Sequence, residues 1–360
     1  MTHESNQPAH RAVLAIPHLR VQNANAISSP LTWGFPAMTA FVGLMRALER
    51  RLGLDPGIAF FAVGVVCHDF EAQINRGGFT HAFRLTRNPV QHDGRSAAIV
   101  EEGRVHLEVT LVFDVEISDA HLADAPRQAL AERIADELAG MRLAGGSIMS
   151  RLQGTTRRVP TRPVLEPVPD ADDNDAGEQH KWFRRLARRW LPGFALVSRN
   201  DLLGARLTEL RAENPTATAL DAWLDLSRWN SHADAPPVTA EGDPTAKVEW
   251  QTDHRPGWIV PIPVGFSALS ALQPPGSVRG ARDMTTPFRF VETVWSVGQW
   301  ISPHRLKRLD DLLWEPVHDP EHPTASGLYR CHNGYQPPPE SPEPANPIND
   351  STQRSIRRAQ

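Results

Sequence analysis

The sequence predicts an α+β protein, and three patterns support this fold class. Residues Val105 to Ile117 alternate between apolar and mostly polar side chains, which is typical of a strand with one buried face. The run from Ala12 to Val21 is rich in small and β-branched residues, and an apolar pattern of helical period follows it. A second helical pattern follows the alternating segment. Two β-α-β passages in succession favour a ferredoxin-like core, in which helices cover one face of an antiparallel sheet.

The first passage can be followed element by element. A strand over 12–21 leads through a polar loop into a helix that begins near Pro36 and stops at Gly53. The apolar run from Ile58 to Cys67 predicts a buried strand, and Thr80 to Thr86 predicts another strand after a glycine turn.

The second passage adds a helix over Ala125 to Leu138 and a strand-like segment from Met141 to Ile148. Residues 160–180 are rich in Pro, Asp and Glu, which predicts a linker or insertion between a core at 1–159 and a more helical second part at 181–335. Within that part the sequence predicts helices at Lys181–Trp190, Asp201–Glu213, Leu220–Trp229 and Pro287–Leu313, and strand content at Glu249–Ser270. Residues 336–360 predict a disordered tail.

Composition narrows the function classes. The net charge of −4 gives no global positive field, so any contact with nucleic acid must come from local basic patches. Because the two cysteines are far apart and no apolar run approaches 20 residues, we expect a cytoplasmic protein without a disulfide or a membrane partner. The fifteen histidines lack the paired spacing of a metal site, and there is no Gly-rich phosphate loop, so we expect neither metal nor cofactor.

The polar loop between the first strand and the first helix is the most informative segment. Its amide and hydroxyl groups both donate and accept hydrogen bonds, and its tryptophan can stack on a base. No Asp, Glu, Cys or His occurs between Val21 and Pro36, which favours binding a polymer over transferring protons. The alternative is a buried connection whose polar groups satisfy the backbone, with the tryptophan in the core. The candidate residues are Gln22, Asn23, Asn25, Ser28, Ser29 and Trp33.

Further candidates come from two glycine-containing segments. In the first, the glycines would let a nucleic-acid backbone approach closely, although a β-bulge or turn needs the same residues. The candidates there are Arg142, Gly145, Gly146 and Ser147. In the second, Arg279 and Arg282 flank a Gly-rich loop and suit phosphate contacts, with a solvated loop as the alternative. The strongest local basic patch is Lys181–Arg189, which suggests nucleic acid or an acidic partner unless it is simply a solvated helix face.

Several long strings also stand in one characteristic order. They are Gln22–Ala37, Ala97–Arg104, Met141–Ile148, Leu191–Arg199, Pro256–Pro263, Thr286–Glu292 and Ser302–Arg305. In these strings the chain resembles, over roughly Ala12 to Arg330, the second subunits of the type I-F CRISPR surveillance (Csy) complex, which are Cas-five-family proteins.

The resemblance implies a non-catalytic subunit of an antiviral ribonucleoprotein, with an RNA-recognition-type core that binds the 5′ handle of the guide RNA. It also implies pairing with the large subunit of the complex and contact with the backbone subunits. A separate endonuclease subunit would process the RNA. Contact with target DNA stays open.

Two other functions compete with this interpretation. Some Cas-five proteins cleave repeat RNA, and His18, His68 and His81 lie near the first strands, where they could act as acid or base. Both tyrosines lie near the C-terminus, however, and no lysine precedes Lys181, so cleavage is the less favoured alternative. The other is a pure scaffold that contacts proteins through Lys181–Arg189.

Overall fold

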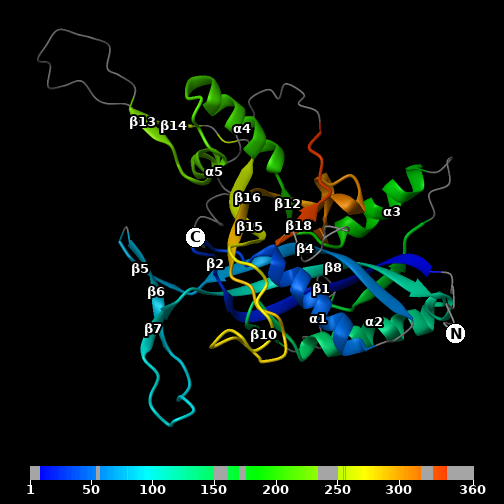
Figure 1. Cartoon of the computed structure of the whole chain (residues 1–360). Helices are drawn as coiled ribbons and strands as arrows, with labels where there is room; N and C mark the ends of the chain where they lie inside the picture. Colours follow the sequence, from blue (N-terminus) through cyan, green and yellow to red (C-terminus); the bar gives the residue numbers. More distant parts are fainter. Residues whose placement is uncertain are drawn as a thin grey trace, which may run out of the picture.

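A large antiparallel sheet organises the molecule, as a computed structural model of the chain shows (Figure 1). The structure describes residues 9–53, 57–78, 80–149, 161–169, 176–233, 250–253, 255, 257–317 and 327–338. The sheet has 11 strands in the order β12-β16-β15-β18-β17-β4-β8-β1-β10-β9, with β11 paired to β1 beside this path. Helices lie on both of its faces, so the predicted α+β class is confirmed.

The elements have the following bounds. The strands of the large sheet are β1 (Ala9–Asn25), β4 (Ile58–Ala72), β8 (Arg104–Ser118), β9 (Arg142–Leu143), β10 (Gly146–Ile148), β11 (Val164–Pro167), β12 (Phe194–Ser198), β15 (Trp258–Ala268), β16 (Val291–Ile301), β17 (Leu313–Val317) and β18 (Leu328–Asn333). The helices of the described residues are α1 (Met38–Leu52), α2 (Asp124–Ala139), α3 (Ala176–Arg188), α4 (Asn200–Glu213) and α5 (Ala219–Ser227), with short 3₁₀ turns η1 (Asp119–His121), η2 (Pro303–Arg305) and η3 (Leu309–Asp311). Smaller sheets are made by β2 (Ile27–Ser29) with β3 (Thr32–Trp33), by β5 (Ile74–Gly77), β6 (Thr80–Arg87) and β7 (Ile99–Glu102), and by β13 (Ser231–Ala233) with β14 (Trp250–Thr252).

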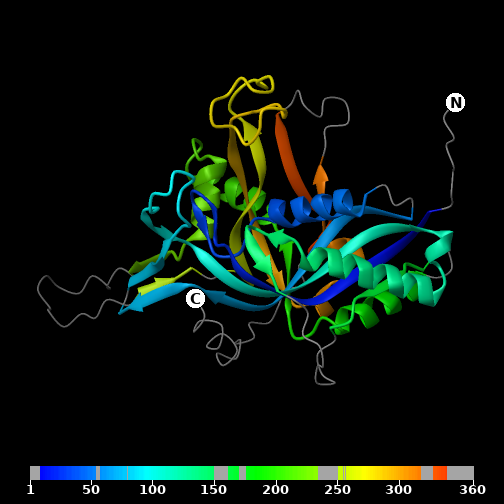
Figure 2. The ribbon, with the colours of Figure 1, turned by 90° about the horizontal axis from the view of Figure 1, so that it is seen from below.

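The run β4-β8-β1-β10 lies towards the β9 end of the sheet, and α1 and α2 cover one face of it (Figures 1 and 2). The alternation that predicted a strand at 105–117 is confirmed as β8, because its odd-numbered side chains are buried against these helices. Leu14 of β1, Leu111 of β8, Phe41 of α1 and Ile134 of α2 belong to the same core cluster. Burial of such side chains, at about 25 cal/mol per Å² of apolar surface, is what holds the helices on this face.

The opposite face of the sheet is covered only in part. There α3 packs Phe183 and Leu186 against Val13 of β1 and Val66 of β4. Further along the same strands, towards β10, polar side chains replace the apolar ones. Arg20 and Gln22 are exposed on β1 next to Ser147 of β10. This polar, open end of the sheet is where the candidate site lies.

One predicted helix is wrong. Residues Pro287–Leu313 contain the long strand β16, followed by the short turns η2 and η3. Five of the 11 residues of β16 are valine or tryptophan, and such side chains fit a pleated surface when a neighbouring strand is available. That neighbour is β15, which pairs with β16 over most of its length. Within this segment, Ser302 precedes only the short 3₁₀ turn η2, which begins at Pro303.

The other predicted elements correspond to β1, α1, β4, β6, α2, β9–β10, α3, α4, α5 and β15, with ends shifted by a few residues. The short strands β12, β17 and β18 were not predicted, since each joins the sheet through residues far away in the chain. Strands from both predicted parts share one sheet, and β11 and the start of α3 lie within the predicted linker. Beyond Pro338 the predicted tail lies outside the described residues. None of the described helices is long and apolar enough to cross a membrane.

Candidate nucleic-acid interface

The edge formed by β1, β10 and β9 brings several predicted site residues together; we call it the β1–β10 edge. Gln22 pairs directly with Ser147 across the two strands, and both side chains are exposed. Arg142 and Gly145, on β9 and in the turn that follows it, are exposed beside them. The Asn25 backbone N–H donates to the Ala144 carbonyl at 2.9 Å, which holds this turn against the end of β1.

Asn23 sits at a bulge in β1. The register between β1 and β8 shifts between Val21 and Ala24, and Asn23 adopts a φ of 56°. Asparagine tolerates this left-handed conformation better than most residues. Its backbone N–H donates to His106 Nδ1 at 3.1 Å. Its exposed side-chain amide has no hydrogen bond to any residue that the structure describes, so it is available to a ligand.

Gly146 has a structural role at this edge. A Cβ atom added there would lie 2.6 Å from the Ala24 nitrogen and 2.7 Å from the Gln22 carbonyl oxygen. Only glycine lets β10 approach the bulge of β1 so closely, which is the bulge alternative considered above. Gly145 differs, because it has a φ of 77° and an added Cβ would meet nothing within 4 Å. Open space for a ligand backbone therefore exists at Gly145.

The two serines of the loop build the β2–β3 hairpin. Ser29 is buried, and its hydroxyl accepts a hydrogen bond from Trp295 Nε1 at 2.9 Å and lies 2.6 Å from Thr32 Oγ1. Ser28 Oγ also lies 2.9 Å from Thr32 Oγ1. These hydroxyls satisfy one another and tie the hairpin to β16, so a ligand would have to break protein hydrogen bonds to use them.

Asn25 fits the structural interpretation of the loop, and Trp33 fits the ligand-binding interpretation. Both amide atoms of Asn25 bind the Ile27 backbone, at 2.8 Å to its oxygen and 3.0 Å to its nitrogen. This residue therefore shapes the turn. Trp33 is 39% exposed, and its ring centroid lies 6.2 Å from that of Phe83 on β6. An aromatic surface is thus present where the three-stranded arm β5-β6-β7 leaves the sheet (Figure 1).

Arg279 and Arg282 lie elsewhere. They are exposed in the loop 269–290 between β15 and β16, which Figure 2 shows projecting beyond α1. Neither side chain forms an ion pair with a described residue. The loop is organised by Asp283, whose carboxylate accepts hydrogen bonds from the Thr285 and Thr286 backbone N–H groups, and these bonds lower the pKa of Asp283 to about 2. The two arginines thus form a second basic site apart from the β1–β10 edge.

One residue of the edge was missed by the sequence reasoning. Arg20 is exposed two residues before Gln22 on β1, and side chains two apart on a strand share a face. It lies opposite Glu108 on β8 in the strand register. The signal that could have found it was the period of two in the first strand, which places Arg20 and Gln22 on the polar face.

The histidines considered for RNA cleavage are partly brought together. The rings of His18 and His68 stack with centroids 4.1 Å apart, and His18 Nδ1 lies 2.6 Å from a Glu108 oxygen. His68 Nδ1 lies 2.7 Å from the Pro192 carbonyl oxygen, which only accepts, so Nδ1 carries the proton. Its Nε2 then accepts from the Thr110 hydroxyl at 2.7 Å. Both nitrogens of His68 are therefore occupied by the protein, and His81 lies on β6 of the arm.

This pair predicts a dependence of stability on pH. Burial lowers the pKa of His68, and the neighbouring His18 adds to that effect. Because the folded protein resists protonation of His68, the unfolded chain takes up this proton first as the pH falls below about 6.5. The contribution of neutral His68 to the free energy of unfolding is therefore fully present above that pH and is lost as the pH falls below it. We expect His68→Gln to flatten the decline between pH 7.5 and 5.5 in denaturant titrations. An equally steep decline in the variant would assign it to other groups.

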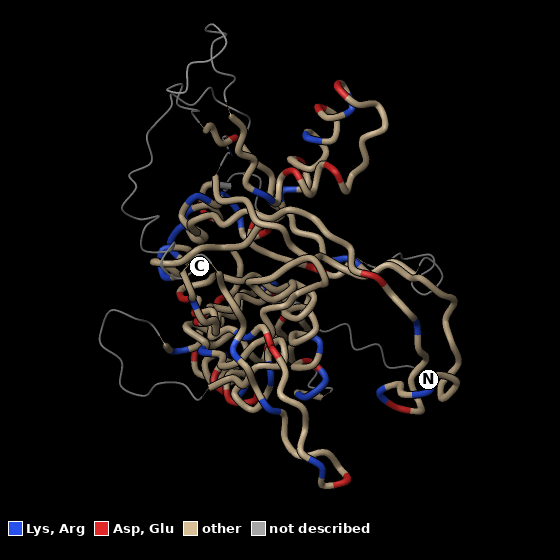
Figure 3. The backbone as a smooth tube through the Cα atoms, turned by 90° about the vertical axis from the view of Figure 1, so that its left-hand side faces the viewer, with Lys and Arg blue, Asp and Glu red and all other residues tan. Residues whose placement is uncertain are grey.

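Metal and thiol chemistry find no support in the described part of the chain. No group of three or more His, Cys, Asp or Glu residues there is arranged to hold a metal ion. Cys67 and Cys331 are free thiols, and burial raises their pKa values to about 12 and about 11. Both stay protonated at neutral pH, so neither is an activated nucleophile. Figure 3 shows basic and acidic positions interspersed along the chain, in keeping with local basic patches only.

Two comparisons place these features among known proteins. A family model described as CRISPR-associated protein (Cas_Csy2) matches residues 14–331. A CRISPR-associated protein Csy2 of Pseudomonas aeruginosa (strain UCBPP-PA14) is 49% identical over 327 residues, which cover 89% of this chain and 94% of that relative. The family match covers β1 from Leu14 onwards, most of the large sheet and the whole β9–β10 hairpin.

Proposed function

Because the chain belongs to the Csy2 family of the type I-F CRISPR system, we propose that it is the non-catalytic subunit that binds the 5′ handle of the guide RNA. The observation that carries the proposal is the β1–β10 edge. There Gln22, Asn23, Arg142 and Ser147 offer amide, guanidinium and hydroxyl groups side by side at the surface. Amide and hydroxyl groups suit base edges and sugars, and arginine suits phosphate.

Four strands of the large sheet support a ferredoxin-like, RNA-recognition-type core for this subunit. The chain runs β1-α1-β4 and then β8-α2-β10, and the four strands lie in the order β4-β8-β1-β10 with antiparallel pairings. Both helices pack on one face. This is the arrangement of a split βαβ core, and it leaves the opposite face open at the β1–β10 end for splayed nucleotides.

We also propose that the chain contacts other proteins of the complex, in the first place the large subunit and the backbone subunits. Trp229 is 75% exposed and Trp250 is 70% exposed, and both lie near the small β13–β14 sheet. Tryptophan is enriched at protein interfaces and rarely stands so open without a partner. A role without catalysis agrees with His68, whose two nitrogens are taken up by Pro192 and Thr110.

Crosslinking within the assembled complex tests the proposal. The tagged chain is copurified from cells that express the whole operon with a CRISPR array, and the crosslinked RNA and peptides are identified. We expect handle nucleotides on peptides that span residues 22–33 and 142–147. The same preparation without the array is the control. Crosslinks that bypass this chain would favour a protein scaffold, and handle ends that depend on His18 would favour RNA cleavage.

The second basic site gives a separate prediction. If Arg279 and Arg282 contact phosphates, each contributes about −0.7 to the slope of log affinity against log salt concentration for single-stranded RNA. The double change Arg279→Gln, Arg282→Gln should therefore flatten the slope by about 1.4, in fluorescence anisotropy titrations from low to high salt. Arg50→Gln with Arg51→Gln removes the same charge from the end of α1 and serves as control. An unchanged slope for Arg279→Gln with Arg282→Gln would mean that this loop is solvated and does not contact RNA.

A further inference from the structure

The basic face of α3 is divided between two sides. Arg185 and Arg189 turn towards β11, where both bind the carboxylate of Glu166 at 3.1 and 2.6 Å. Arg184 and Arg188, one position earlier in each turn, form no ion pair or hydrogen bond within the described part of the chain. Two arginines of the basic patch thus share one carboxylate, whereas Arg184 and Arg188 have no ion pair among the described residues.

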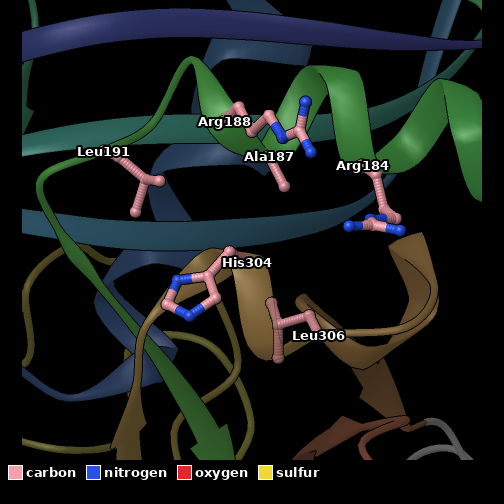
Figure 4. Close-up of a pocket in the computed structure, with 6 residues that line it drawn as sticks. All are labelled: Arg184, Ala187, Arg188, Leu191, His304 and Leu306. Atoms are coloured by element: carbon pink, nitrogen blue, oxygen red, sulfur yellow. The ribbon is translucent and has the colours of Figure 1, made fainter.

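The free half lines a pocket between α3 and η2, which we call the α3–η2 pocket (Figure 4). Its volume is about 290 Å³, and its lining residues are Arg184, Ala187, Arg188, Leu191, His304 and Leu306. Figure 4 shows the two arginines projecting from α3 on one side, with His304 and Leu306 on the other. His304 Nδ1 lies 2.8 Å from Ser302 Oγ. When the serine donates this bond, the imidazole proton is on Nε2 and available to an acceptor.

The charged side chains that line the pocket are all basic. Lys181, Arg305 and Lys307 are exposed on the same two segments, and the Lys307 carbonyl lies 3.2 Å from His180 Nδ1, which joins the segments. The acids of the neighbouring turn are already engaged. Asp310 pairs with Arg11 at 2.8 Å, and Asp311 pairs with Arg308 at 3.4 Å. No carboxylate lines the pocket, so its cations repel one another until an anion enters.

We propose that the α3–η2 pocket binds the phosphodiester backbone of a nucleic acid, at a place separate from the β1–β10 edge. Arg184 and Arg188 are four residues apart and therefore neighbours on the helix surface, so they present two guanidinium groups in a row along one strand of phosphates. The additional lysines and Arg305 extend the row, as a polyanion requires and a single carboxylate does not. Apolar Ala187, Leu191 and Leu306 limit water around the contact and strengthen it.

The test uses the full-length chain with two labelled probes that lack the handle sequence, a duplex DNA and a single-stranded RNA. Arg184→Gln with Arg188→Gln should reduce the steepness of the salt dependence by about 1.8 for duplex DNA or about 1.4 for single-stranded RNA. The control variant, Arg185→Gln with Arg50→Gln, also removes two positive charges, one from α3 and one from α1. It leaves the Arg189–Glu166 pair intact. Melting temperatures confirm that both variants are folded.

The two probes distinguish the sources of the phosphate. A change confined to the duplex assigns the pocket to DNA, and a change confined to the single strand assigns it to RNA. Equal slopes in variant and control with both probes would overturn the proposal. So would loss of a protein subunit from the copurified complex in the variant with nucleic-acid binding intact, since the pocket would then take an acidic protein. Because the probes lack the handle, these outcomes are independent of the function proposed for the β1–β10 edge.

Discussion

A variant carrying Gln22→Ala, Asn23→Gly and Arg142→Gln is expected to bind handle RNA about 100-fold more weakly than the unchanged chain while keeping its fold. Two neutral hydrogen bonds contribute about 0.5–1.5 kcal/mol each, and one charge-assisted bond contributes about 1.5–3 kcal/mol. Their sum is about 2.5–6 kcal/mol. A 100-fold change corresponds to about 2.7 kcal/mol, at the lower end of this range. The three side chains are exposed, and only Arg142 has a described protein partner, the Gly145 carbonyl at 3.2 Å.

The choice of substitutions follows from the backbone. Asn23 has a φ of 56°, where alanine would add strain of about 1–2 kcal/mol and glycine adds none. Asn25 is left unchanged, because its amide holds the Ile27 backbone and its loss would disturb the loop itself. Affinity is measured by anisotropy with a short labelled handle RNA, and Arg50→Gln is the matched control. Equal affinity for variant and control would remove the β1–β10 edge from the RNA-binding surface.

The sequence predicted best where local pattern and tertiary environment agree. The alternation in residues 105–117 predicted β8, since burial against α1 and α2 selects the same positions as the pattern. The prediction of a helix at 287–313 failed, because β16 forms as a strand by pairing with β15. The long loop 269–290 separates these two strands in the chain. No local signal could show that Glu166 of β11 pairs with Arg185 and Arg189 but with neither of the two arginines that precede them.

The candidate site shows the same limit. Residue types in the polar loop correctly located a surface rich in amides, but which amides are free depends on hydrogen bonds that only the folded chain defines. Asn23 is turned outwards by a bulge in the pairing of β1 with β8. The Ser29 hydroxyl, in contrast, already accepts a hydrogen bond from Trp295, 266 residues later in the chain. The composition of the polar loop therefore indicates which groups it offers, and the fold decides which of them are free.

Gly146→Ala is expected to lower the free energy of unfolding by about 1–3 kcal/mol, the usual cost of overpacking, and towards the upper end of this range. Its Cβ would meet backbone atoms of Gln22 and Ala24 at 2.7 and 2.6 Å, and backbone cannot rotate away as a side chain can. Relief requires β10 to move from β1, which would separate Ser147 from Gln22 and weaken RNA binding as a consequence.

The adjacent glycine provides the matched control for this experiment. In Gly145→Asn the new residue tolerates a φ of 77°, and its Cβ meets open space. The stability of this variant should therefore stay near that of the unchanged chain. Denaturant unfolding and handle-RNA anisotropy are measured on both variants. If Gly146→Ala unfolds like the unchanged chain yet binds RNA weakly, Gly146 faces RNA and its packing role is wrong. If instead stability and binding fall together only in Gly146→Ala, the glycine acts by holding the two strands of the β1–β10 edge in register.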